Sequence, residues 1–168
     1  CLNGALAGLR GDKWSTRELD SSVRSSVREL NDASFNLMTT KVAFDADNDV
    51  YLLASGSGTP AYLHSTNQGE TFTAYEIPGP RGRFDIEQFS GHNIPDAPPP
   101  FARFVRVGGG HPGLRWRSEN RLELFVPRKV NGRIDIGEPI VISKMAIGLS
   151  AHSGIPSSVV SREDSVHV

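Results

Sequence analysis

The sequence predicts an all-β protein built from short antiparallel strands. Short apolar segments alternate with polar residues, and clusters of turn-forming residues separate these segments at close intervals. The 168 residues also include 17 Gly and 11 Pro, which favours many turns over long helices. A chain of this length is sufficient for one domain with a hydrophobic core.

The composition argues against several classes of function. The formal net charge at pH 7 is −1, which offers no electrostatic case for binding nucleic acid or an anionic membrane. The single Cys cannot form an internal disulfide. No apolar run approaches the roughly 18 to 20 residues of a membrane-spanning helix. No phosphate-binding loop, zinc-ligand spacing or dinucleotide fingerprint is present, so we expect neither a metal nor an organic cofactor.

The N-terminal segment, residues 1–35, allows two interpretations. Four apolar residues recur at helical spacing: Leu19, Val23, Val27 and Leu30. This spacing favours a short amphipathic helix, and a pair of strands over the same stretch is the alternative. The segment is either separate or the end of a preceding structural unit.

A first four-stranded unit is predicted over residues 36–79. The four expected strands cover residues 37–44, 50–54, 61–65 and 71–77. A polar run from Asp45 to Asp49 forms the first turn, and Pro78-Gly79-Pro80 ends the unit. Four short antiparallel strands in about 42 residues have the size of one β-propeller blade.

A second unit is predicted over residues 80–148, with a long inserted loop. Residues 80–100 are expected to contain little secondary structure, because three consecutive prolines at 98–100 disfavour helix and central strand. A loop of this length is typically functional or disordered, and its aromatic and charged residues favour a functional loop. Residues 101–107 are expected to form a strand. Asn131-Gly132 between two alternating segments predicts a β-hairpin, because both residues accept positive φ.

Residues 149–168 are predicted to begin a further unit, so the chain supplies two to three blades of a partial β-propeller. A propeller closes with at least about four blades, and about six or seven are expected here. Fewer blades leave apolar faces and a strand edge uncovered. We therefore expect this chain to be a fragment, with the missing blades supplied by the rest of a longer chain or by another chain.

The stretch "STNQGETF" carries the most specific motif of the sequence. Asn67 can cap free backbone N–H groups, and Gly69 can adopt the left-handed conformation that a tight hairpin requires. The hydroxyls of Ser65 and Thr71 can bind further backbone groups, and Phe72 can pack beneath the turn. These residues are expected to stabilise a turn rather than perform chemistry.

The same stretch resembles the Asp-box, or BNR repeat, whose pattern is Ser-x-Asp-x-Gly-x-Thr-Trp. Ser65, Gly69 and Thr71 match this pattern, while Asn67 stands in place of Asp and Phe72 in place of Trp. The resemblance implies a β-propeller of the sialidase (neuraminidase) superfamily, with the turn between the third and fourth strands of a blade and away from the active centre. A Ser/Asn/Gly hairpin in another all-β fold is the alternative.

The resemblance also implies a carbohydrate-active protein that hydrolyses or binds a glycan, with a secreted or periplasmic location. If it is an enzyme, an exo-sialidase-like glycoside hydrolase is preferred. The alternatives are a propeller-type polysaccharide lyase acting on a uronate, and a non-catalytic ligand-binding propeller. In sialidases the first arginine that binds the substrate carboxylate lies in an Arg-Ile-Pro stretch. In the similar stretch "SGIPSS" Gly154 replaces that arginine, so this substrate-binding residue does not carry over.

Three residues are candidates for catalysis. His92 and His152 lie in Gly- and Ser-rich turns next to Ile-Pro, and histidine titrates close to neutral pH. Glu87 follows Asp85 at a spacing of two, which in an extended segment places both carboxylates on one side, an arrangement that suits acid–base chemistry. The alternative for each is an ordinary surface or turn residue. His64 is expected to be structural or exposed.

A substrate-binding platform is predicted around Trp116. Sugars stack on tryptophan faces, and the flanking guanidinium groups of Arg115 and Arg117 can bind carboxylates. The alternative is a packed Trp between two exposed Arg. Tyr62 is a further candidate for lyase chemistry. The oxygen-rich run from Asp45 to Asp49 is similar to a calcium loop but lacks its Gly and distal Glu, so we interpret it as a polar turn.

Overall fold

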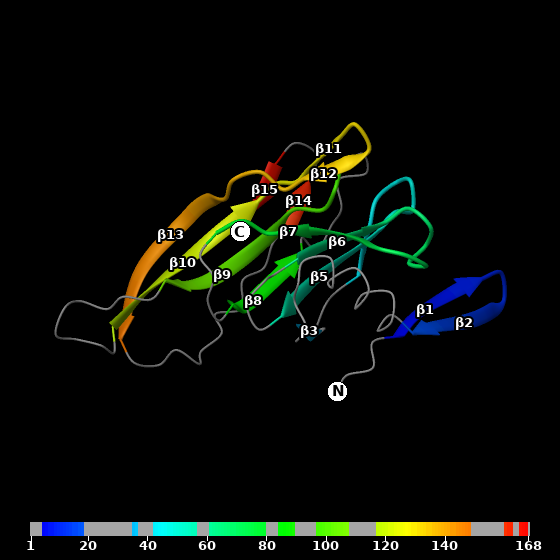
Figure 1. Cartoon of the computed structure of the whole chain (residues 1–168), viewed down its shortest axis with the longest axis horizontal. Helices are drawn as coiled ribbons and strands as arrows, with labels where there is room; N and C mark the ends of the chain where they lie inside the picture. The colour runs from blue at the N-terminus through cyan, green and yellow to red at the C-terminus, as the bar shows by residue number, and fades with distance from the viewer. Residues whose placement is uncertain are drawn as a thin grey trace.

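The computed structural model of the chain is all-β (Figure 1). It describes residues 5–18, 35–36, 42–56, 61–79, 84–89, 97–107, 117–148, 160–162 and 165–167. These ranges contain fifteen β-strands and no α-helix. Accordingly, the described part of the chain holds no helix with the length and hydropathy needed to cross a membrane.

The first sheet contains five strands, of which the last three in the chain form an antiparallel meander. Its strands are β3 (Phe35–Asn36), β4 (Ala43–Phe44), β5 (Val50–Gly56), β6 (Ala61–Ser65) and β7 (Thr73–Glu76). Both β3 and β4 pair with β5. The strands predicted at 50–54 and 61–65 are confirmed, and the fourth is shorter than predicted. The last two residues of the strand expected at 37–44 form β4. Residues 37–41 of that expected strand lie outside the described ranges.

The second sheet contains four antiparallel strands in the order β13-β10-β9-β8. Its strands are β8 (Phe84–Phe89), β9 (Phe101–Val107), β10 (Arg117–Phe125) and β13 (Ile140–Gly148). Between β10 and β13 the chain forms a separate hairpin of β11 (Arg128–Val130) and β12 (Arg133–Asp135). Asn131 and Gly132 have φ of 51° and 76°, which confirms the predicted turn.

The prediction of little secondary structure over residues 80–100 is wrong. The segment contains β8, whose "FDIEQF" alternates apolar and polar residues, and the turn-forming residues around it concealed this pattern. The three prolines at 98–100 are buried. Pro99 accepts a hydrogen bond of 3.0 Å from Tyr62 Oη, so the prolines help to join this segment to the first sheet.

Two further hairpins lie near the ends of the chain. The sequence analysis missed the first, which pairs β1 (Ala5–Arg10) with β2 (Lys13–Glu18). Residues 19–34, where a helix or a strand pair was expected, lie outside the described residues. The second hairpin pairs β14 (Val160–Arg162) with β15 (Ser165–His167), within the range predicted to begin a further unit.

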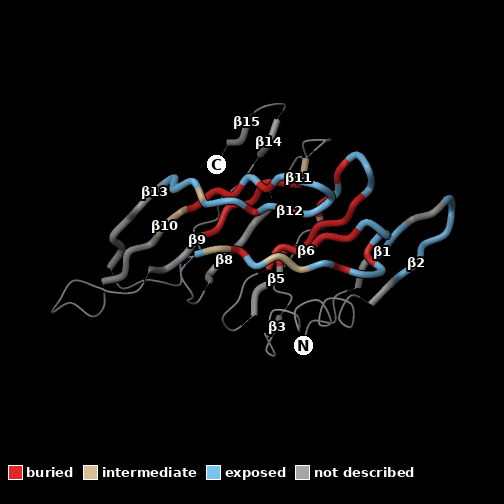
Figure 2. Tube along the Cα trace, turned by 45° about the horizontal axis from the view of Figure 1, so that its top comes forward, coloured by how far each residue is buried: buried red, intermediate tan, exposed pale blue. Residues whose placement is uncertain are grey.

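The two sheets share one apolar core (Figure 2). The first sheet and its flanks contribute Ala43, Tyr51, Leu53, Tyr62 and Ile77, and the second sheet with the β11–β12 hairpin contributes Phe101, Phe125, Ile134 and Ile136. A row of aromatic rings runs through this core. The ring centroids of Phe101 and Phe125 are 4.7 Å apart, and Tyr62 lies 5.5 Å from Phe101. Such contacts contribute roughly 0.5–1.5 kcal/mol each beyond area burial.

A buried ion pair lies beside this aromatic row. Arg103 on β9 and Glu123 on β10 are register partners, and Glu123 Oε2 accepts hydrogen bonds of 3.0 Å from Nε and 2.6 Å from Nη2. The guanidinium also covers the Phe125 ring at 4.8 Å. A Cβ atom at Gly79 would overlap the guanidinium, so only glycine fits there without rearrangement.

Candidate functional site

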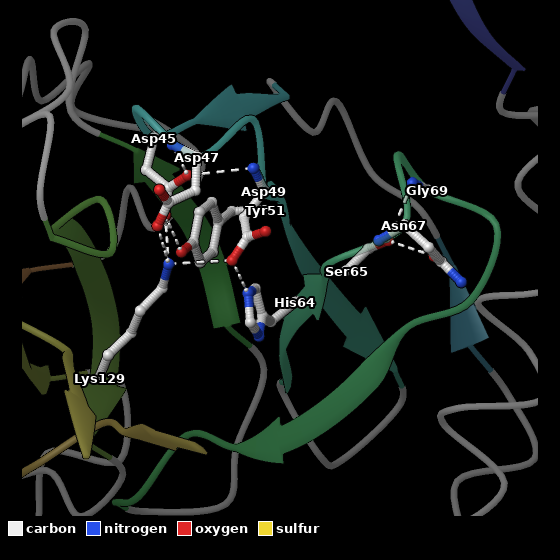
Figure 3. A network of polar contacts seen from close by, with 9 residues as sticks. All are labelled: Asp45, Asp47, Asp49, Tyr51, His64, Ser65, Asn67, Gly69 and Lys129. Carbon is white, nitrogen blue, oxygen red and sulfur yellow. Dashed lines mark hydrogen bonds and ion pairs between the residues drawn. The ribbon is translucent and has the colours of Figure 1, made fainter. Parts of the chain in front are cut away.

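The turn between β6 and β7 is held by the side chains of Ser65, Asn67 and Thr71, the first two of which are drawn in Figure 3. Ser65 Oγ accepts hydrogen bonds from the backbone N–H groups of Gly69 at 2.8 Å and Asn67 at 3.3 Å, and donates to Asn67 Oδ1 at 2.8 Å. Asn67 Oδ1 accepts from the Thr71 N–H at 2.9 Å, and Asn67 Nδ2 donates to Thr71 Oγ1 at 2.8 Å. The network thus satisfies three backbone donors within one turn.

The backbone of this turn explains the glycine in the motif. Gln68 and Gly69 have φ of 60° and 81°, and the left-handed conformation of Gly69 is the one expected from the sequence. Phe72 is buried at the end of the turn. The side chains that hold the turn are uncharged hydroxyls and an amide, so the arrangement supports a structural role for them.

A second network begins at the turn between β4 and β5. Asp45 Oδ1 accepts hydrogen bonds from the backbone N–H groups of Asp47 at 3.1 Å and Asp49 at 3.0 Å. Asn48 adopts a positive φ of 61°, which asparagine tolerates better than most residues. This geometry agrees with the interpretation of the run as a polar turn.

Lys129, from the β11–β12 hairpin, supplies a cation to this acidic turn (Figure 3). Its Nζ lies 2.6 Å from Asp45 Oδ2, 2.9 Å from Asp49 Oδ2 and 3.4 Å from Asp47 Oδ2. The ammonium group therefore occupies the point where the three carboxylates converge. Among the residues that the structure describes, no cluster of His, Cys, Asp and Glu has the arrangement of a metal site.

Tyr51 and His64 complete the network from neighbouring strands. They are register partners in β5 and β6, and their rings stack at 4.9 Å. Tyr51 Oη donates a hydrogen bond of 2.6 Å to Asp45 Oδ2, and His64 Nε2 lies 2.7 Å from Asp49 Oδ2. His64 is buried, so of its two expected states, structural or exposed, it is not exposed.

The electrostatics of the network favour charged Asp45, charged Lys129 and neutral Tyr51. Burial opposes the charge on Asp45, but hydrogen bonds from Lys129 and Tyr51 outweigh it and hold the pKa of Asp45 below its ordinary value. Burial alone would lower the pKa of Lys129, but hydrogen bonds to Asp45 and Asp49 raise it well above its usual range. Burial and the hydrogen bond to Asp45 also raise the pKa of Tyr51. These three shifts suit a fixed ionic contact rather than proton transfer at neutral pH.

The candidate catalytic and substrate-binding residues are only partly covered by the structure. Four of them, His92, His152, Arg115 and Trp116, lie outside the described residues. The backbone places Glu87 in β8 and Arg117 at the start of β10, on two strands of the same sheet. Tyr62 is fully buried, and burial raises its pKa, so the structure argues against Tyr62 as a proton-transfer group.

The sequence analysis missed the contact between Lys129 and the acidic turn. The alternating aspartates at 45, 47 and 49 were visible, and they suggested a cation. The cation is a lysine more than eighty residues away in the chain. Only the packing of the β11–β12 hairpin against the first sheet brings it there.

Comparisons of this chain with protein-family models, with curated proteins and with solved structures gave no match.

Proposed function

We propose that this chain is part of a β-propeller of the Asp-box type and that the protein hydrolyses or binds a glycan. The turn at residues 65–72 carries this proposal. Its serine, amide, glycine and threonine form one hydrogen-bond network, and an aromatic residue is buried directly after it. It lies between the two strands where the resemblance implies an Asp-box.

The arrangement of the two sheets supports the propeller part of the proposal. In the first sheet β4, β5, β6 and β7 follow one another as antiparallel neighbours, and in the second sheet β8, β9, β10 and β13 do the same. The two sheets bury one shared core. The first sheet also contains β3, which pairs with β5 beside β4. Propellers are built from four-stranded sheets packed around a central channel. On this proposal the β11–β12 hairpin is an insertion before the last strand of its blade.

Within the described residues, the buried titratable groups are used by the fold. Asp45, Asp49 and His64 are held in the Lys129 network, and Glu123 is paired with Arg103. The catalytic candidates are therefore still His92, His152 and Glu87, with Arg115, Trp116 and Arg117 as the proposed binding platform. A secreted or periplasmic location belongs to the same proposal.

A panel of oligosaccharides tests this function and distinguishes a hydrolase, a lyase and a non-catalytic binding protein. The chain is titrated with neutral, amino, uronate and sialylated oligosaccharides by isothermal calorimetry, and each mixture is then assayed for products. New reducing ends without unsaturated sugars indicate a hydrolase, unsaturated uronates indicate a lyase, and binding without products indicates a non-catalytic propeller. His92→Ala and His152→Ala are expected to abolish product formation in the two enzymatic cases. If no oligosaccharide is bound or converted, the proposed function is wrong.

A further inference from the structure

A shallow, open groove lies between β7 with the residues after it and β12 with the residues after it. Its volume is about 440 Å³. The residues that line it include Tyr75, Glu76, Pro78, Asp135, Ile136 and Glu138. Neither the Lys129 network nor the turn at 65–72 contributes to it. The groove thus needs its own explanation.

The apolar part of the groove is anchored in the core of the protein. Ile134 and Ile136 line it and are 5% and 7% exposed, and both belong to the core cluster shared by the two sheets. Tyr75 is half-buried, packs against the same cluster and also lines the groove. Because Tyr75 packs against the core, the fold sets the position of the exposed part of its ring in the groove, and the two isoleucines form the buried base beneath it.

The polar part of the groove carries negative charge. Glu76, Asp135 and Glu138 are exposed and line it, and no Lys or Arg is among the described residues that do so. Asp135 Oδ1 accepts a 3.1 Å hydrogen bond from the Gly137 N–H, which orients this carboxylate. Carboxylates in such a place accept strong hydrogen bonds from hydroxyl and ammonium groups and repel anions.

We propose that this groove binds a saccharide without carboxylate or sulfate groups, and that an amino sugar binds more tightly than a neutral one. The apolar face of a sugar ring would lie against Tyr75 and Pro78, while its hydroxyl or ammonium groups donate to the carboxylates of Asp135 and Glu138. A uronate would bring its own negative charge against them. This inference rests on the proposed function and adds a second saccharide site, whose described lining does not include Arg117 of the proposed carboxylate-binding platform.

Calorimetric titration with three hexasaccharides that share one linkage tests the inference. The ligands are a neutral glucan, the corresponding glucosamine oligomer and the corresponding uronate oligomer. We expect the glucosamine oligomer to bind most tightly, the neutral glucan less tightly and the uronate oligomer least tightly. Raising the salt concentration should weaken binding of the amino sugar, because screening reduces its attraction to the carboxylates, and should leave the neutral sugar nearly unaffected.

Variants then assign the binding to the groove. Asp135→Asn and Glu138→Gln should each reduce amino-sugar affinity about tenfold, since each removes one charge that pairs with the ligand. Their effect on the neutral sugar should be less than about threefold. Asp12→Asn makes the same change in charge at the β1–β2 turn, which does not line the groove, and should alter neither affinity. Urea denaturation of each variant verifies that it is folded.

The outcomes separate this inference from the proposed function. If Asp135→Asn and Glu138→Gln leave the amino-sugar affinity unchanged, or if they weaken binding of the uronate as much as binding of the amino sugar, the groove assignment is overturned while glycan binding stands. If no saccharide binds, the proposed function fails and the groove assignment with it. A lysine-rich peptide is titrated as well, and peptide binding that depends on Glu138 without saccharide binding would identify the groove as a peptide site and overturn the inference.

Discussion

The ammonium group of Lys129 lies 2.6 Å from Asp45 Oδ2, although the two residues are 84 positions apart in the chain. Their contact joins the β11–β12 hairpin to the turn that precedes β5. Because Asp45 is also the acceptor for two backbone N–H groups of its own turn, one carboxylate links local turn formation to long-range packing.

Replacing Lys129 by Met should destabilise the protein by about 2–4 kcal/mol. The variant retains the aliphatic part of the side chain but leaves the buried carboxylates of Asp45 and Asp49 without their counter-ion. Urea denaturation measures the change in the free energy of unfolding. Asp47→Asn is the matched control, since Asp47 is 81% exposed and 3.4 Å from Nζ, and its loss should cost less than about 1 kcal/mol. Equal stability of Lys129→Met and the wild type would contradict the role of the contact.

Stability should decline at both ends of the pH range. The pKa of Asp45 is held below its ordinary 3.8, so its contribution is complete above that value and is lost as the pH falls through the lower folded pKa. The pKa values of Lys129 and Tyr51 are raised above their ordinary 10.5 and 10.0, so their contributions are complete below about pH 10 and are lost as the pH rises further. Melting temperatures between about pH 2 and 12 measure both effects. In Lys129→Met the decline on the acid side should be shallower than in the wild type, and an unchanged profile would count against this account.

The stability of the turn at 65–72 should depend on Oδ1 of Asn67 rather than on its Nδ2. Asn67→Ala removes the acceptor for the Thr71 N–H and the donor to Thr71 Oγ1, and should cost about 1–2 kcal/mol of unfolding free energy. Asn67→Asp retains the acceptor and restores the usual Asp-box residue, so it should lie within about 1 kcal/mol of the wild type. Chemical denaturation of both variants measures the free energy of unfolding and so distinguishes a role of Oδ1 from a role of Nδ2. Equal losses in the two variants would show that the acceptor is not what matters.

Gly79 should be far less replaceable than Gly137, although both have positive φ. Gly79→Ala adds a methyl group against the Arg103 guanidinium at a φ of 126°, and should cost about 3 kcal/mol or more. Gly137→Ala, at a φ of 68° and with no atom within 4 Å of the new Cβ, should cost only about 1 kcal/mol for the backbone conformation. Thermal and urea unfolding of the two variants compares them directly. Similar costs would mean that Arg103 moves away easily from position 79.

Local signals in the sequence were sufficient for much of the secondary structure. Alternation and turn chemistry placed β5, β6 and β9, and Asn131-Gly132 located the β11–β12 hairpin. The same reasoning failed for β8, because the prolines and glycines around it dominated the pattern, and it overlooked the β1–β2 hairpin altogether.

The sequence by itself therefore determined the all-β class, the positions of several strands and the chemistry of the turn at 65–72, because these depend on side chains within a few residues of one another. The tertiary structure alone decided that the two sheets share an aromatic core, that Lys129 neutralises the acidic turn and that Gly79 lies against Arg103. It also decided where the groove between β7 and β12 lies. The physical reason is that these contacts join residues far apart in the chain, and their geometry is set by packing across two sheets rather than by any local pattern.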